Sequence, residues 1–151
     1  MPNESRSTFV FGQRSKNNLT GVNPVLIKVL YRALEITPAD FAVIQGVRGR
    51  EEQRKNVVKG VSQTMNSRHL EECPVDDGVC IGNAVDVLPS AMKPGMDWNK
   101  NAHLFEPVLQ AIKQAGDELG VKLRFGKNWK EDPSLSVQTK FPDYPHVEIP
   151  R

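Results

Sequence analysis

Residues 83–89 have the sequence NAVDVLP, which reads as a short buried strand with one acidic residue inside it. Apolar residues flank Asp86, and Pro89 ends the run because proline cannot donate to a strand ladder. A carboxylate inside an apolar strand is costly to bury unless it is paired or bound to a metal. The stretch therefore predicts one strand of the sheet and one candidate functional residue.

Three other segments are typical of strands. FAVIQGV at residues 41–47 reads as a buried strand, and VKLRFG at 121–126 alternates between apolar and polar residues. HVEI at 146–149 closes the chain as a short strand. The polar, proline-bearing residues 128–145 before it are expected to form a loop.

Helical patterns separate these strands. Asn23-Pro24 is typical of a helix start, apolar residues follow at helical spacing to Leu34, and Thr37-Pro38 ends the helix. Residues 50–60 read as a second, polar helix. Residues 103–119 repeat apolar positions every three or four residues, with Gly120 at the end. Mixed helices and strands without regular βαβ alternation predict an α+β fold with a mainly antiparallel sheet.

Length and composition favour one globular domain spanning residues 1–151. The chain is 38% hydrophobic and 25% charged, with a net charge of +2. Residues 1–20 read as a loose polar lead-in, loosest over about 1–8. No run approaches the ~18 apolar residues of a membrane span, and the N-terminus lacks the apolar core of a secretory signal. Basic residues are dispersed and aromatic content is 7%, which disfavours nucleic acid as a partner. We expect a monomer that contacts no membrane.

A wider stretch, from Ser67 to Pro89, gathers His69 and both cysteines close to Asp86. It is compatible with a thiol metal site, a redox pair, or half of a metal site completed elsewhere. Cys73 and Cys80 are six residues apart with no second pair, which excludes a four-cysteine zinc site and a C-x-x-C motif. An ordinary surface loop is favoured, and a disulfide that gates activity is a further hypothesis.

Without the cysteine loop, the remaining set is His69, Asp86 and His146. Two imidazoles and one carboxylate suit zinc and leave a fourth position for water. Satisfied structural histidines are the more common alternative. Asp143 lies three residues before His146, where it can act as a general base on such a water, or simply form a turn. Glu148 falls on the same strand face as His146, as support for the ligand or as a solvated charge.

Arg48 and His103 complete the candidates. Arg48 follows the strand at 41–47, where a guanidinium can bind a carboxylate or a developing oxyanion. A surface arginine is the alternative interpretation and, on these grounds alone, the favoured one. His103 begins the long helix away from any carboxylate cluster and is interpreted as structural or exposed.

The motifs S-x-H at 67–69, AVD at 84–86 and D-x-P-H-V-E at 143–148 together resemble the M15 family of zinc peptidases. This family includes D-Ala-D-Ala carboxypeptidases and phage L-alanyl-D-glutamate endopeptidases, and the phage enzymes are the most similar. The resemblance extends to residues 33–53, to Asp97-Trp98 and to residues 115–129.

The resemblance implies a Hedgehog/D-Ala-D-Ala-peptidase-type fold and a Zn²⁺ cofactor. It implies His69, Asp86 and His146 as zinc ligands and Asp143 as the catalytic base. Arg48 matches the family arginine that stabilises the substrate oxyanion, and Ser67 matches a residue that lines the substrate site.

One departure from the family pattern is an insertion. The family usually has H-x-x-G-x-A-x-D, whereas 16 residues here separate His69 from Asp86. Gly82, Ala84 and Asp86 keep the end of the motif, so the added residues are about 70–81 and carry both cysteines. Insertions of this kind are tolerated in loops whose ends stay close together.

The function implied is that of a phage endolysin. Such an enzyme cuts the L-Ala-D-Glu bond of the peptidoglycan stem peptide during host lysis. It waits in the host cytoplasm until a holin opens the membrane and then acts on the cell wall in the periplasm. The alternatives are a D,D-carboxypeptidase or dipeptidase on the same polymer, and a non-catalytic wall-binding module that holds zinc.

Overall fold

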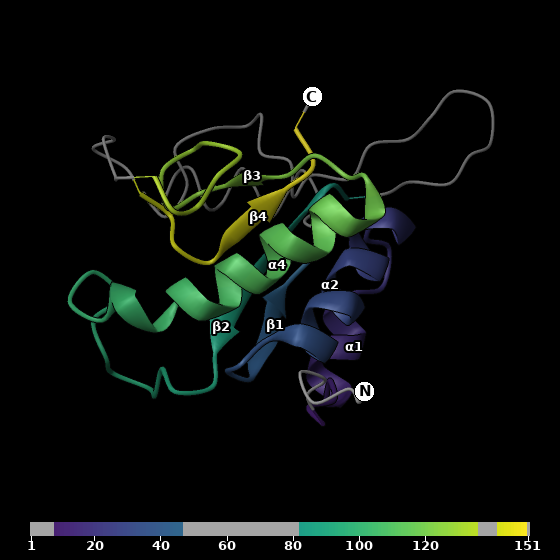
Figure 1. Cartoon of the computed structure of the whole chain (residues 1–151). Helices are drawn as coiled ribbons and strands as arrows, with labels where there is room; N and C mark the ends of the chain where they lie inside the picture. Colours follow the sequence, from purple (N-terminus) through teal and green to yellow (C-terminus); the bar gives the residue numbers. More distant parts are fainter. Residues whose placement is uncertain (1–7, 47–81, 136–141, 151) are drawn as a thin grey trace, which may run out of the picture.

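The computed structural model describes residues 8–46, 82–135 and 142–150 (Figure 1). These residues form helices and an antiparallel sheet, which confirms the predicted α+β class. The elements in chain order are α1 (Gln13–Asn18), α2 (Pro24–Ile36), β1 (Phe41–Gln45), β2 (Ala84–Pro89), the 3-10 helix η1 (Ala102–Leu104), α4 (Glu106–Leu119), β3 (Arg124–Phe125) and β4 (His146–Glu148).

Within the described ranges the sheet has the strand order β1-β2-β4-β3, and every neighbouring pair is antiparallel. The β1–β2 register shifts between Val43 and Gln45, so that Gln45 lies opposite Asp86. Such a bulge re-aims the residues beyond it. It therefore brings Gln45 and Asp86, both polar, to the same position of the sheet.

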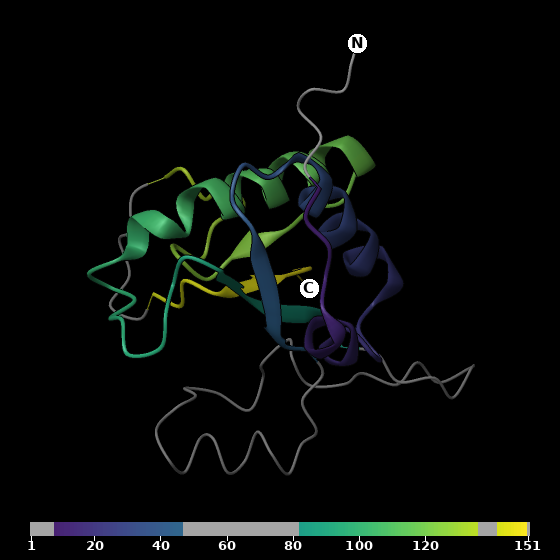
Figure 2. The ribbon, with the colours of Figure 1, turned by 90° about the horizontal axis from the view of Figure 1, so that it is seen from below.

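The core lies between the sheet and the two long helices, α2 and α4, which run side by side (Figures 1 and 2). Leu26, Leu30, Leu109 and Ile112 are completely buried there with Val85 and Val87 of β2. Burying each such side chain contributes roughly 1.5–3 kcal/mol. This packing fixes the position of the sheet on which the candidate site is built.

Local signals place both helices where the sequence predicts them. Asn23 caps α2, because its Oδ1 accepts from the Val25 N–H at 2.9 Å. Gly120 ends α4 in the left-handed region at φ 71°, and the Val121 N–H donates to the Gly116 carbonyl at 2.8 Å. The helix predicted at 103–119 is divided between η1 and α4.

One sequence prediction is wrong, and the length of one strand differs from the prediction. Residues 1–20 are not all a loose lead-in, because α1 forms there and both Phe11 and Leu19 belong to the core. The α1 side chains bind the outer strand: Ser15 Oγ accepts from the Val43 N–H at 3.0 Å, and Asn18 Nδ2 donates to the Val43 carbonyl at 2.8 Å. The strand expected at 121–126 is present as β3, but only Arg124 and Phe125 pair with a neighbouring strand.

Some predictions concern residues outside the described ranges, including the polar helix at 50–60 and the cysteine loop at about 70–81. No helix among the described residues has the length and apolar character needed to cross a membrane.

Candidate metal centre and active site

The candidate site lies on the sheet face opposite to the helical core. Asp86 of β2 and His146 of β4 are register partners, so their side chains leave the same face next to each other. Their neighbours Val85 and Val147 point to the other face and are completely buried. The alternation that builds the core therefore also directs these two side chains toward the site.

Asp143 reaches the same place through a tight turn that precedes β4. The His146 N–H donates to the Asp143 carbonyl at 3.0 Å and closes the turn. Gly126, directly after β3, holds the turn from the other side. Its N–H donates to the His146 carbonyl at 2.8 Å, and its carbonyl accepts from the Asp143 N–H at 2.8 Å.

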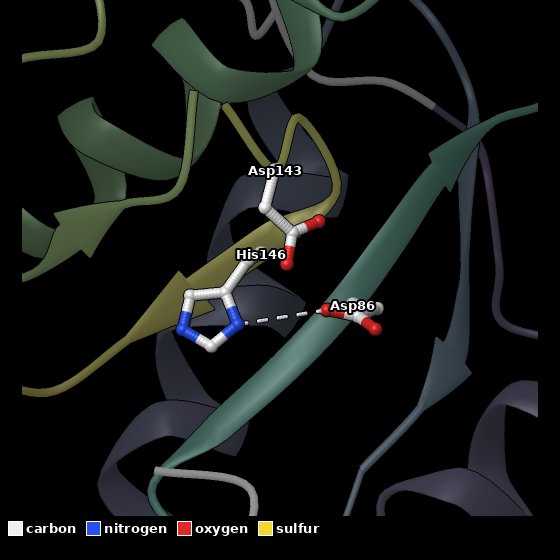
Figure 3. Close-up of side chains that lie close together, drawn as sticks. All are labelled: Asp86, Asp143 and His146. Atoms are coloured by element: carbon white, nitrogen blue, oxygen red, sulfur yellow. Dashed lines mark ion pairs between the residues drawn. The ribbon is translucent and has the colours of Figure 1, made fainter. Parts of the chain in front are cut away.

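Asp86, Asp143 and His146 form a compact cluster (Figure 3). His146 Nδ1 lies 3.7 Å from Asp86 Oδ1, and one donor atom from each of the three residues lies within 4.8 Å of the others. Imidazole and carboxylate donors bind a metal at roughly 2.0–2.2 Å, so two donors of one ion lie at most about 4.4 Å apart. The 3.7 Å between His146 Nδ1 and Asp86 Oδ1 satisfies this limit, and the 4.8 Å bound on the whole cluster exceeds it by only about 0.4 Å, so the cluster is a candidate for a divalent metal ion.

Glu148 binds the far side of the same imidazole. Its Oε1 lies 2.7 Å from His146 Nε2, and both side chains are only 5% exposed. An imidazole that donates from Nε2 to a carboxylate has its lone pair on Nδ1, the nitrogen that faces Asp86. The contact therefore selects the tautomer suited to binding a metal within the cluster.

The electrostatics of the site favour a bound cation. Burial lowers the pKa of His146, but its hydrogen bonds with Asp86 and Glu148, and the charges of Asp86 and Asp143, raise the pKa to about 9. Three carboxylates thus surround one imidazole in a largely dehydrated environment, where like charges repel strongly. A proton or a metal ion at Nδ1 relieves this repulsion.

The structure brings together three of the residues that the sequence singled out, Asp86, Asp143 and His146, and adds Glu148 behind them. The predicted ligand His69, together with Ser67 and Arg48, lies outside the described residues. His103 is exposed in η1, as expected, and does not belong to the cluster.

Sequence reasoning missed two neighbours of the site, Arg124 and Trp129. Arg124 Nε lies 3.4 Å from Glu148 Oε2, and the Trp129 ring lies 5.1 Å from the His146 ring, centroid to centroid. Arg124 carried a partial signal, because it alternates with buried residues in a predicted strand. Trp129 carried none, because its position depends on a turn that the sequence does not specify.

Comparison with known proteins gives consistent results. A model of the phage L-alanyl-D-glutamate peptidase family matches residues 7–149. The L-alanyl-D-glutamate peptidase of Escherichia phage T5 is 35% identical over 147 residues, which cover 94% of this chain and 98% of that protein. The crystal structure of the Serratia marcescens L-Ala D-Glu endopeptidase ChiX superposes with a TM-score of 0.69 at 30% identity. That match covers 93% of this chain and 90% of the other.

Proposed function

Because the chain belongs to the phage L-alanyl-D-glutamate peptidase family, we propose that it is a zinc-dependent endolysin. It cleaves the bond between L-alanine and D-glutamate in the stem peptide of bacterial peptidoglycan. The observation that carries the proposal is the cluster of Asp86, Asp143 and His146, with Glu148 bound to the far side of the imidazole. Donor types, spacing and negative charge all suit a catalytic metal there.

His69, Asp86 and His146 would hold the zinc ion. When bound, zinc supplies Lewis-acid polarisation of the scissile carbonyl and makes an attacking water more acidic. The location of Asp143 within the cluster is compatible with two roles, a base beside the metal or a further metal ligand. We assign it the role of base, since the two histidines and Asp86 already supply the three protein ligands of a catalytic zinc site.

Side chains of the protein carry out proton transfer, stabilise the oxyanion and orient the metal ligand. Asp143 takes a proton from the attacking water and later returns it to the departing amine of D-glutamate. Arg48 stabilises the negative charge that develops on the carbonyl oxygen, and Ser67 lines the substrate site. Glu148 orients His146 through the 2.7 Å contact at Nε2.

We infer that residues 1–151 form a single domain with a Hedgehog/D-Ala-D-Ala-peptidase-type fold and act as a monomer. The likeness to the ChiX structure over most of both chains supports this fold. As an endolysin, the enzyme would remain in the host cytoplasm until a holin releases it to the periplasmic cell wall.

The test is digestion of purified Gram-negative peptidoglycan, with and without a chelator, and analysis of the products by mass spectrometry. New L-alanine C-termini and D-glutamate N-termini are expected, and they should disappear on chelation and return with zinc. Release of D-alanine would instead place the enzyme among the D,D-carboxypeptidases. Zinc binding without any product would point to a non-catalytic module.

The three histidines of the chain offer matched variants for the metal. His69→Ala and His146→Ala should lose bound zinc and activity together, whereas His103→Ala should keep both because His103 is exposed and outside the cluster. Zinc content is measured by atomic emission on the folded proteins. Full zinc retention in His69→Ala would refute the proposed ligand set.

A further inference from the structure

Glu148 has a neighbour at each carboxylate oxygen. Oε1 lies 2.7 Å from His146 Nε2, and Oε2 lies 3.4 Å from Arg124 Nε. The Glu148 side chain is 5% exposed, so its negative charge is largely withdrawn from water. A charged carboxylate is costly to bury unless a nearby positive charge or hydrogen bonds offset the loss of its hydration. Arg124, directly across the strand pair on β3, supplies that charge.

Arg124 has a partly exposed side chain whose Nε atom is buried beside Glu148. Its side chain is 43% exposed, but its Nε atom is buried and has no hydrogen-bond partner within the part of the chain that the structure describes. The 3.4 Å separation from Glu148 is an ion pair, longer than the roughly 2.7–2.9 Å of a charge-assisted hydrogen bond. The buried Nε of the guanidinium therefore lies beside the carboxylate that contacts His146, as an ion pair rather than a hydrogen bond.

Trp129 fixes the other side of this arrangement. The guanidinium carbon of Arg124, Cζ, lies 5.1 Å from the centroid of the Trp129 indole, within range of a cation–π interaction. The same indole lies 5.1 Å from the His146 ring, at an interplanar angle of 49°. One aromatic side chain thus contacts both the metal-binding imidazole and the arginine that supports Glu148.

The backbone of Trp129 has a conformation that is energetically unfavourable for a bulky residue. Its φ is 56°, in the left-handed region that bulky residues rarely occupy. A tight turn imposes the conformation: the Trp129 N–H donates to the Phe125 carbonyl at 2.7 Å, and the Phe125 N–H donates to the Lys130 carbonyl at 2.9 Å. Strain of this kind persists where surrounding bonds over-determine it, commonly at functional sites.

We propose that Arg124 and Trp129 are positioning residues for the metal ligand His146. Arg124 holds Glu148 against Nε2, and the indole of Trp129 fixes the plane of the imidazole and keeps water away from the Nε2–Glu148 bond. The proposal rests on the proposed function insofar as His146 binds zinc. Outer partners of metal-binding histidines typically contribute 10–100-fold in metal affinity.

The experiment compares zinc affinity in four variants. Trp129→Asn removes the indole, while asparagine still tolerates the left-handed backbone. Arg124→Gln removes the charge at a half-exposed position. Trp98→Asn is the matched control, because Trp98 is the other of the chain's two tryptophans, is 40% exposed, and packs against Phe105.

We expect the zinc Kd, measured by competition with a chromophoric chelator, to rise about 10–100-fold in Trp129→Asn and Arg124→Gln but not in Trp98→Asn. The absorption spectrum of the Co²⁺-loaded protein should change in the same two variants, and kcat should fall while KM stays near that of the parent. Arg124→Lys keeps the positive charge and should recover part of the affinity.

An unchanged zinc Kd in Arg124→Gln and in Trp129→Asn would overturn the proposal. Should Trp129→Asn fail to fold, Arg124→Gln decides alone, and an equal loss of affinity in Trp98→Asn would also count against a specific role. A parent protein that binds zinc but releases D-alanine overturns the proposed function and leaves this comparison valid. A parent that binds neither zinc nor Co²⁺ overturns both.

Discussion

Replacement of Gly126 by alanine tests how closely the turn before β4 is packed. Gly126 is buried, and its φ lies outside the left-handed region, so the need for glycine comes from space. A Cβ at this position would lie 2.3 Å from the Asp143 carbonyl oxygen and 2.7 Å from His146 Cβ. Both clashes involve atoms of the chain segment that carries the candidate base and ligand.

The size of the expected effect follows from these distances. Since real Cβ contacts begin near 3.0 Å and are ordinary at 3.4 Å, the Asp143 carbonyl must move by about 0.7–1.1 Å. A misplacement of about 1 Å at a catalytic group can reduce the rate roughly 100-fold. Overpacking costs about 1–3 kcal/mol of unfolding free energy, partly offset by about 0.4–1 kcal/mol from the stiffer unfolded chain.

We therefore expect kcat/KM of Gly126→Ala to fall roughly 100-fold on a defined stem-peptide substrate. The melting temperature should decrease by up to about 10 °C, on the scale of roughly 2–4 °C per kcal/mol for a chain of this size. Activity is measured by chromatography of the cleaved peptide, and melting by circular dichroism on the zinc-loaded protein.

Two other glycines provide controls. A Cβ at Gly12 would meet nothing within 4 Å, so Gly12→Ala should change neither quantity appreciably. A Cβ at Gly116 would lie 2.9 Å from Leu123 Cδ1, in the core below α4, so Gly116→Ala should affect stability without loss of activity per folded molecule. Parental activity and melting temperature in Gly126→Ala would refute the argument from close packing.

Three further predictions concern the base, the core and the pH dependence. Asp143→Asn should keep zinc at parental affinity and lower kcat by about 10²–10⁴-fold, as expected for a general base, whereas loss of zinc would make Asp143 a ligand. Ile112→Ala should reduce the unfolding free energy in urea by about 2–5 kcal/mol with unchanged activity per folded molecule, because Ile112 is completely buried in the core; a loss below 1 kcal/mol would contradict this packing. The pKa of His146, raised above the ordinary 6.5 to about 9, should stabilise the zinc-free protein fully below pH 6.5, and this contribution should be lost as the pH rises through 9. Urea titrations in chelator at pH 6 and pH 9.5 measure that loss, and a gain attributable to His146, judged against His146→Gln, would contradict it.

The elements that the sequence predicted well are those with local signals. The Asn23 cap and apolar stripe specify α2, Gly120 ends α4, and Pro89 ends β2. In contrast, α1 has the sequence QRSKNN, which has no apolar stripe. It is anchored by bonds from Ser15 and Asn18 to the distant strand β1, and such tertiary bonds leave no local pattern.

The same distinction applies to the site. The three-residue spacing between Asp143 and His146 allowed their proximity to be predicted, since a turn brings such residues together. Asp86 and His146 were grouped as candidate zinc ligands from their residue types, the family resemblance implied the same pair, and strand register places them side by side. Arg124 and Trp129 could not be assigned, because the first acts across a strand pair and the second through a turn with an unusual backbone.

The binding of α1 to β1 has a consequence for how molecules of this protein meet one another. Among the strands of residues 8–46, 82–135 and 142–150, β1 is the outermost, and exposed strand edges are templates for pairing with another chain. Ser15 and Asn18 occupy both backbone groups of Val43 and so close this edge at its middle. Shortening the chain past residue 18 would expose these groups and promote aggregation. Engineered fusions should therefore join the chain before Phe11.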